Sequence, residues 1–253
     1  MRITFLGTGT SQGVPVIACK CGTCLSDDKR DKRLRSSVLI ETGEKNFVID
    51  TGPDFRQQML REKVTHLEAI LFTHDHRDHI AGLDDIRAFN FNSNSPVDVY
   101  AEENVQESLK KQYSYVFENN KYPGTPRINI HLIQNTSFFI DETKIIPIRV
   151  MHYRLPVLGF RIGDFTYITD ANFISEQEKE KIIGTKHLVI NALRRQKHIS
   201  HYNLSQSLKI IKELSPRKAY LIHMSHQMGR TSEVEHLLPD NVMLAYDGLK
   251  VEV

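Results

Sequence analysis

Short apolar runs with the composition of β-strands recur along the whole chain and alternate with segments of helical composition. In the first half these runs lie at 2–6, 36–42, 46–50 and 69–73. In the second half they lie at 144–151, 158–170, 187–193, 218–223 and 243–253. Strand pairs followed by helices in both halves predict an α/β fold with two packed sheets and helices outside them.

Turn signals and helical segments add detail to this prediction. The turn 43–45 predicts a hairpin between the runs beside it, and Gly163 with Asp164 predicts another within 158–170. The stretch 243–253 predicts a last pair of strands. Helices are expected at 55–63, 82–91, 102–118, 175–183 and 203–214, with Asn203 as the N-cap of the last one.

Length and composition describe an ordinary globular protein. The chain has 253 residues, 25% of them charged, so we expect residues 1–253 to form a single domain. The 33 basic and 31 acidic residues are mixed along the chain, so charge does not predict a nucleic-acid partner. The absence of an apolar leader, and of any run near the roughly 18 apolar residues of a membrane span, favours a cytoplasmic protein without a membrane partner.

Histidines and aspartates are crowded directly after the apolar run 69–73. The motif is His74-x-His76-x-Asp78-His79. Neutral imidazole nitrogens and carboxylate oxygens are ligands that zinc, manganese and iron accept. A tetrahedral catalytic zinc takes three protein ligands and a water, whereas this motif alone offers four candidates. The motif therefore indicates two metal ions, with two of the four side chains on each.

Three more candidates lie where other apolar runs end. His152 follows 144–151, Asp170 ends 158–170, and His223 ends 218–223. Because strand ends meet at one edge of a sheet, we expect these side chains to lie near the histidine motif, with Asp170 able to bridge both ions. A water held between two such ions ionises near neutral pH and becomes a nucleophile.

The only cysteines form a second cluster. Cys19, Cys21 and Cys24 are too close together and too odd in number for a disulfide framework. Three thiolates lack one ligand of a closed zinc site, and His226 lies three residues beyond His223. The spacing predicts a structural Cys₃His zinc, the alternative being three reduced cysteines in a loop.

A glycine-rich segment opens the chain. Residues 7–13, "GTGTSQG", have no following Lys-Ser or Lys-Thr pair, and "VPV" replaces the helix that a nucleotide loop requires. We interpret the segment as a tight turn that lets backbone approach the metals or a bound phosphate.

On these motifs the chain resembles the metallo-β-lactamase fold superfamily, whose signature is H-x-H-x-D-H followed by His, Asp and His. The resemblance covers nearly the whole chain and implies an αββα sandwich. It further implies one ion on His74, His76 and His152, a second on Asp78, His79 and His223, and Asp170 between them. Asp50, in "VIDTG", matches the aspartate that steadies the metal-binding loop in this superfamily.

The segment "GTGTSQGVPV", the three cysteines and the ending "AYDGL" resemble the PhnP-like phosphodiesterase branch of that superfamily. This resemblance implies hydrolysis of a small or cyclic phosphodiester through a hydroxide that bridges two catalytic ions, zinc or manganese, with a separate structural zinc. His201 matches the non-ligand catalytic histidine and is our candidate general acid, with Asp78 as the other catalytic residue. Neighbouring His198 is the alternative acid.

Two other functions remain open. A nuclease resembling the transfer-RNA 3′ endonucleases shares the ligands, but the chain shows no long Gly- and Lys-rich insertion to grip RNA. A non-hydrolytic metal protein would resemble the pyrroloquinoline quinone biosynthesis B protein; such relatives tend to depart from the full ligand set, whereas all seven positions are filled here. The aromatics at 113–117 would suit a homodimer contact or a lid.

Overall fold

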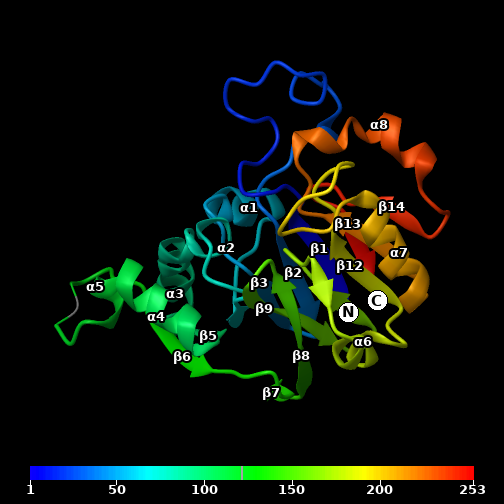
Figure 1. The fold of residues 1–253 in the computed structure, drawn as a ribbon. Coiled ribbons are helices and arrows are strands. Elements are labelled where there is room, and N and C mark those ends of the chain that lie inside the picture. The colour runs from blue at the N-terminus through cyan, green and yellow to red at the C-terminus, as the bar shows by residue number, and fades with distance from the viewer. Residues whose placement is uncertain (121) are drawn as a thin grey trace.

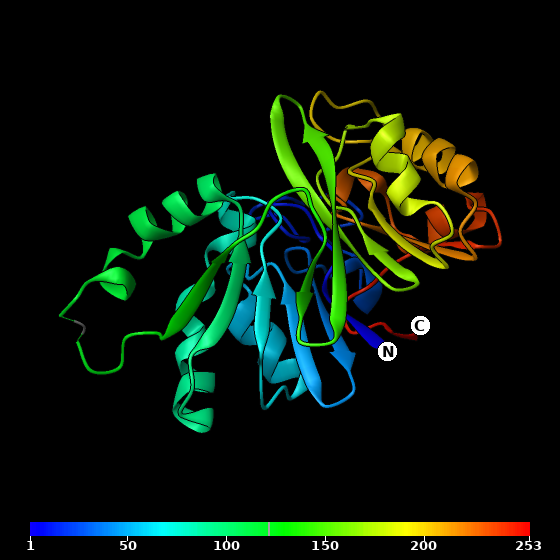
Figure 2. The ribbon, with the colours of Figure 1, turned by 90° about the horizontal axis from the view of Figure 1, so that it is seen from below.

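The computed structural model describes residues 1–120 and 122–253 and has two mixed β-sheets packed face to face, with helices on both outer surfaces (Figures 1 and 2). This αββα sandwich confirms the predicted fold class. The two termini lie side by side in both views, and the Met1 amino group donates to the Val253 carbonyl at 3.2 Å. Within the described ranges, no helix is long and apolar enough to cross a lipid bilayer.

The first sheet is built mainly from the first half of the chain. Its strands are β1 (Arg2–Gly7), β2 (Ser37–Thr42), β3 (Lys45–Ile49), β4 (Ala69–Leu71), β5 (Val97–Ala101), β6 (Ile128–Leu132) and β15 (Lys250–Glu252). They lie in the order β15-β1-β2-β3-β4-β5-β6. β2 and β3 pair in antiparallel fashion, which confirms the first predicted hairpin, and β3 to β6 are parallel.

The second sheet comes from the second half. Its strands are β7 (Phe138–Ile140), β8 (Thr143–His152), β9 (Leu155–Ile162), β10 (Phe165–Tyr167), β11 (Phe173–Ile174), β12 (His187–Asn191), β13 (Lys218–Ile222) and β14 (Val242–Leu244). The order is β11-β8-β9-β10-β12-β13-β14, with β7 beside β8. β9 and β10 form the second predicted hairpin, and β10, β12, β13 and β14 are parallel.

Helices cover the outer faces of both sheets. Over the first sheet and its connections lie α1 (Phe55–Glu62), α2 (Arg77–Ile80), η2 (Leu83–Ile86), α3 (Arg87–Ser93), α4 (Glu103–Gln112) and α5 (Ser114–Phe117). The later part of the chain carries α6 (Glu176–Ile182), α7 (Leu204–Leu214), η3 (His226–Met228), α8 (Thr231–Val234) and η4 (Glu235–Leu237), and η1 (Lys29–Asp31) precedes β2. Asn203 caps α7 as predicted, since its side chain accepts from the Gln206 amide at 3.0 Å.

Apolar side chains form three layers that follow from this architecture. Between the sheets, Phe5 and Phe47 of the first sheet belong to one cluster with Phe160 of the second, all 0% exposed. Phe55 of α1 belongs to the cluster outside the first sheet, and Ile211 of α7 to the one outside the second. The alternation of apolar residues along each element therefore buries both faces of both sheets.

Two predicted elements were wrong in detail. The helix expected at 102–118 is divided between α4 and α5 at Tyr113, which leaves the helical conformation with φ −121° and ψ 43°. The Tyr113 hydroxyl donates to the Ile80 carbonyl at 2.9 Å, a tertiary contact that outweighs local helix propensity. Tyr113 is therefore buried, whereas Tyr115 is 39% exposed.

The other correction concerns the last two strands. The strand pair expected at 243–253 is two strands in different sheets, because β14 pairs with β13 and β15 pairs with β1. Gly248, with φ +89°, lies in the connection, and its amide donates to the Phe5 carbonyl at 2.8 Å. The C-terminal segment thus crosses from one sheet to the other.

Replacing Phe160 by Ala should lower the free energy of unfolding by about 3–5 kcal/mol, because the change leaves a cavity between the sheets. Urea denaturation measures this loss. Phe139→Ala is the control: Phe139 lies on β7 and is 60% exposed, so its loss should stay within about 0.5 kcal/mol. Equal losses in the two variants would contradict the assignment of Phe160 to the central layer.

Candidate metal centre

Three of the predicted site residues occupy sharp backbone turns at strand ends. Asp50 follows β3, Asp170 lies three residues beyond β10, and His223 follows β13. Their φ angles are +64°, +60° and +54°, a left-handed conformation that non-glycine residues seldom adopt. Such conformations persist where the surrounding structure fixes them, and they are commonest at functional sites.

The histidine motif forms the connection between β4 and α2. His76 precedes the first turn of α2, and Asp78 and His79 lie within that helix. The His79 carbonyl accepts from the Thr51 amide at 2.7 Å, which ties the motif to the loop after β3. These two loops pack backbone against backbone, because a Cβ on Gly52 would lie 2.2 Å from the Asp78 carbonyl oxygen.

The carboxylate of Asp170 lies at the centre of the cluster and is 2% exposed. Its Oδ1 is 3.1 Å from Nδ1 of His223 and 3.5 Å from Nε2 of His79. Its Oδ2 is 3.3 Å from Nε2 of His201 and 3.8 Å from Nε2 of His74. One carboxylate therefore faces imidazoles from both sheets.

Each of the buried histidines has one ring nitrogen held by a neighbour. Nδ1 of His74 lies 2.9 Å from the Thr73 hydroxyl, and Nδ1 of His79 lies 2.7 Å from the Asp50 carboxylate. Nε2 of His223 lies 3.1 Å from the Thr10 hydroxyl. The other nitrogen of each ring faces the interior of the cluster.

His152 is oriented in the same way by backbone. Its Nδ1 donates to the carbonyls of Asp170 and Ser200, at 2.9 and 3.0 Å, so its Nε2 carries a free lone pair. The His152 ring lies 5.1 Å from the His76 ring between centroids. This arrangement leaves both rings available to bind one metal ion.

The donor set fits divalent cations. Among the described residues, the buried atoms Nε2 of His74, Nε2 of His79 and Nδ1 of His223 have no hydrogen-bond partner. An unpaired buried polar atom costs about 1–3 kcal/mol, and a cation would satisfy all three. Ligand atoms within 4.8 Å of one another form three groups: Asp78, His79, Asp170 and His223; His74, His76 and Asp170; and His152, Asp170 and His201.

The structure thus brings all seven predicted ligands together. The group containing Asp78, His79, Asp170 and His223 matches the set predicted for the second ion. His74, His76 and His152 surround the other side, with ring centroids 4.6 to 5.9 Å apart. Asp170 belongs to all three groups, which is the position expected of a bridging carboxylate.

Electrostatics keep most of these groups in the forms that bind metal. Burial lowers the pKa of His74 well below its ordinary value and the pKa of His223 to about 4. Burial opposes the charge of Asp170, but His223 and His79 hold its pKa well below the ordinary value. His79 is the exception: burial lowers its pKa, but Asp78, Asp170 and Asp50 together raise it well above the ordinary value.

Asp50 lies behind the histidine motif. It is fully buried, and burial raises its pKa. Its carboxylate accepts from the Thr73 amide at 2.9 Å and the Thr73 hydroxyl at 2.8 Å, and it contacts Nδ1 of His79. These contacts place it where the sequence predicts a residue that steadies the loop.

His201, the predicted general acid, lies at the cluster and is 8% exposed. Its Nε2 faces Asp170, and its Nδ1 lies 3.0 Å from the Ser200 hydroxyl and 3.2 Å from Nδ1 of His198. His198 is therefore one ring further from Asp170. The geometry favours His201 over His198 for a role at the reacting atoms.

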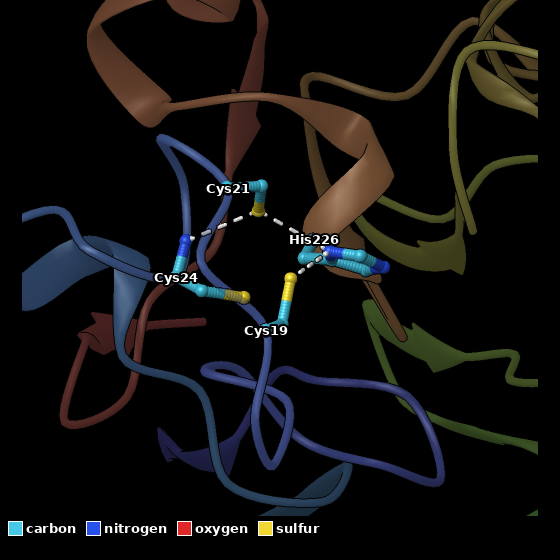
Figure 3. Close-up of side chains that lie close together, drawn as sticks. All are labelled: Cys19, Cys21, Cys24 and His226. Carbon is cyan, nitrogen blue, oxygen red and sulfur yellow. Dashed lines mark hydrogen bonds between the residues drawn. The ribbon is translucent and has the colours of Figure 1, made fainter.

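The cysteine cluster is a separate site, shown in Figure 3. The Sγ atoms of Cys19 and Cys21 each lie 3.3 Å from Nδ1 of His226, and the Cys24 amide donates to Sγ of Cys21 at 3.5 Å. The four ligand atoms lie within 4.8 Å of one another, as a Cys₃His metal site requires. Hydrogen bonding, first from the Cys24 amide and then from His226, lowers the pKa of Cys21 to about 6, whereas burial raises the pKa of Cys24 to about 11.

The glycine-rich segment 7–13 contains the predicted tight turn, because the Gly13 amide donates to the Thr10 carbonyl at 2.8 Å, but the close approach of its glycines differs from our interpretation. Its glycines allow close approach to residues 33–35 rather than to the metal centre, because a Cβ on Gly9 would lie 2.9 Å from Cβ of Arg33. The side chain that reaches the centre is Thr10. The sequence does not reveal this contact, since Thr10 and His223 are 213 residues apart and no spacing rule connects them.

Comparison with known proteins adds a family and a fold. The family model described as the Beta-lactamase superfamily domain matches residues 45–224. A crystal structure described as that of a new diphosphatase from the PhnP family superposes with a TM-score of 0.94 at 36% identity. That match covers 100% of this chain and 97% of the other.

Two curated relatives carry other names. An octanoyltransferase of Porphyromonas gingivalis is 40% identical over 253 residues, covering 99% of this chain and 51% of that protein. A ribonuclease Z of Acaryochloris marina is 29% identical over 169 residues, covering 65% of this chain and 48% of that protein. The chain thus spans about half the length of these relatives.

Asp50→Asn should weaken metal binding at the central cluster by about 10 to 100-fold, because it removes the charge that orients His79. Titration of the metal-free protein against a chelator of known affinity measures the change. Asp54→Asn is the matched control: Asp54 lies on the same loop but pairs with Arg35, so the affinity should not move. Equal weakening in both variants would count against the role of Asp50.

Cys21→Ser should lower the zinc content by one ion per chain and lower the Tm, because the cysteine cluster keeps only three ligands. Elemental analysis and calorimetry measure the two effects. Thr23→Val, in the same loop but outside the cluster, should retain the wild-type zinc content. Unchanged zinc in Cys21→Ser would mean that these cysteines are reduced thiols without a metal.

Proposed function

Because the chain belongs to the metallo-β-lactamase superfamily and to its PhnP family, we propose that it is a dinuclear metal-dependent phosphodiesterase acting on small or cyclic phosphodiesters. The observation that carries the proposal is the cluster around Asp170, in which buried imidazoles from both sheets present unpaired nitrogens to one carboxylate. Since the ligands come from both halves of the chain, we also propose that residues 1–253 act as one domain.

We assign these residues to two ions. His74 and His76, with His152 beside them, would hold the first, Asp78, His79 and His223 would hold the second, and Asp170 would contact both. When bound, such a pair supplies charge stabilisation for phosphoryl oxygens and acidifies a water molecule so that it ionises near neutral pH. The preset orientation of each ring lowers the cost of assembling the site.

The chain itself supplies the proton for the leaving group. Hydrolysis joins a water oxygen to phosphorus and breaks the bond to the leaving oxygen, which must then gain a proton. Nε2 of His201 points into the cluster at 3.3 Å from Asp170 and would donate that proton. Ser200 and His198 contact its Nδ1 and hold the ring in place.

The named relatives support chemistry at phosphorus. A diphosphatase and a ribonuclease both act on phosphate esters or anhydrides. The octanoyltransferase extends well beyond the matched part, so its name assigns no acyl chemistry to the part shared with this chain. The ribonuclease Z match favours RNA as the second candidate substrate, although it covers 65% of the chain against 100% for the diphosphatase.

His201→Ala should reduce turnover of bis(p-nitrophenyl) phosphate by about 10²-fold or more with the metal content unchanged, because the leaving oxygen loses its proton donor. Steady-state kinetics with elemental analysis of the same samples provide the measurement. His198→Ala is the control and should lose much less, since His198 contacts His201 and Ser200 but belongs to none of the ligand groups around Asp170. A wild-type rate in His201→Ala would remove His201 from the mechanism.

A substrate panel tests the proposed function as a whole. The metal-loaded protein is assayed on cyclic ribose phosphates, 2′,3′-cyclic nucleotides, an organic diphosphate, precursor transfer RNA and an octanoyl thioester. We expect the highest kcat/KM on a small cyclic diester. Turnover of transfer RNA alone would favour the nuclease, and turnover of the thioester alone would refute the phosphodiesterase.

A further inference from the structure

The glycine-rich segment 7–13 carries two buried threonines, and only one of them touches the metal centre. Thr10 is 7% exposed and its hydroxyl lies 3.1 Å from Nε2 of His223. Thr8 is 0% exposed, and its hydroxyl donates to Asp247 and accepts from Arg33, both at 2.8 Å. The two residues therefore have the same chemistry in the same loop, but different partners.

We propose that Thr10 is a positioning residue that fixes the ring orientation and tautomer of His223 for binding the second ion. His223 is 1% exposed, and its Nδ1 faces Asp170 with no hydrogen-bond partner among the described residues. A nitrogen that binds a cation must present a lone pair, so Nε2 must carry the ring proton. The Thr10 hydroxyl accepts that proton and leaves Nδ1 free.

The backbone around this contact is already fixed. The Thr10 amide donates to the Met224 carbonyl at 3.1 Å, and the Met224 amide donates to the Thr8 carbonyl at 3.0 Å. His223 and segment 8–10 thus keep their relative position without the hydroxyl. The hydroxyl fixes only the rotation of the His223 imidazole about its side-chain bonds. A substitution can therefore remove the hydroxyl without moving the backbone.

The inference rests on the metal centre of the proposed function, and it gives a specific expectation. Thr10→Val keeps the shape but leaves the Nε2 proton of His223 buried without an acceptor. We expect the second ion to bind about 10 to 100-fold more weakly. Binding of the first ion, by residues that do not contact Thr10, should not change. Thr10→Ser keeps the hydroxyl and should bind both ions with wild-type affinity.

The experiment titrates metal-free protein with Co²⁺ against a competing chelator and follows the absorption spectrum of each site. Thr8→Val is the matched control, because it removes a buried hydroxyl from the same loop without touching a ligand. It should lower the Tm while leaving both Co²⁺ affinities unchanged. Equal weakening in Thr8→Val and Thr10→Val, or wild-type affinity in Thr10→Val, would overturn the proposal.

A measurement on the wild-type protein covers the case in which Thr10→Val does not fold. ¹⁵N NMR of the zinc-loaded protein should show His223 with a slowly exchanging proton on Nε2 and zinc on Nδ1. The opposite assignment would overturn the proposal. Because neither measurement uses a substrate, a protein with this tautomer but no diesterase turnover would refute the proposed function and leave the role of Thr10 intact.

Discussion

The carboxylate of Asp170 is the contact on which the rest of the site depends. It is 2% exposed and lies within 3.8 Å of four imidazoles. A cluster of this kind stores free energy, because three of its ring nitrogens are buried without partners in the described chain. Bound cations would offset that cost, so metal binding at the centre should also raise the stability of the fold.

Much of this arrangement can be predicted from sequence, because the ligands follow a simple rule of position. His152, Asp170 and His223 are polar residues at the ends of apolar runs, and strand ends meet at one edge of a sheet. The two hairpins follow from their turn residues in the same way. Local chemistry thus determines which side chains can reach the centre.

The features that could not be predicted depend on contacts between residues distant in sequence. The helix break at Tyr113 is stabilised by a carbonyl 33 residues away, and the orientation of His223 by a hydroxyl 213 residues away. The separation of β14 from β15 depends likewise on the pairing of the C-terminal segment with Phe5. Each is a tertiary hydrogen bond, which leaves no period or spacing in the sequence.

The two sheets supply different parts of one coordination sphere, and this has a mechanical consequence. His74 and His79 lie in the connection after β4 of the first sheet, whereas His152 ends β8 and His223 follows β13 of the second. Bonds between metals and protein ligands tolerate only about 0.2 Å, so a slip of about 1 Å between the sheets would exceed that tolerance several-fold. The aromatic layer of Phe5, Phe47 and Phe160 packs between the sheets and therefore sets the separation of the ligands that the two sheets carry. Substitutions that change side-chain volume in that layer should therefore alter metal selectivity even where every ligand is retained.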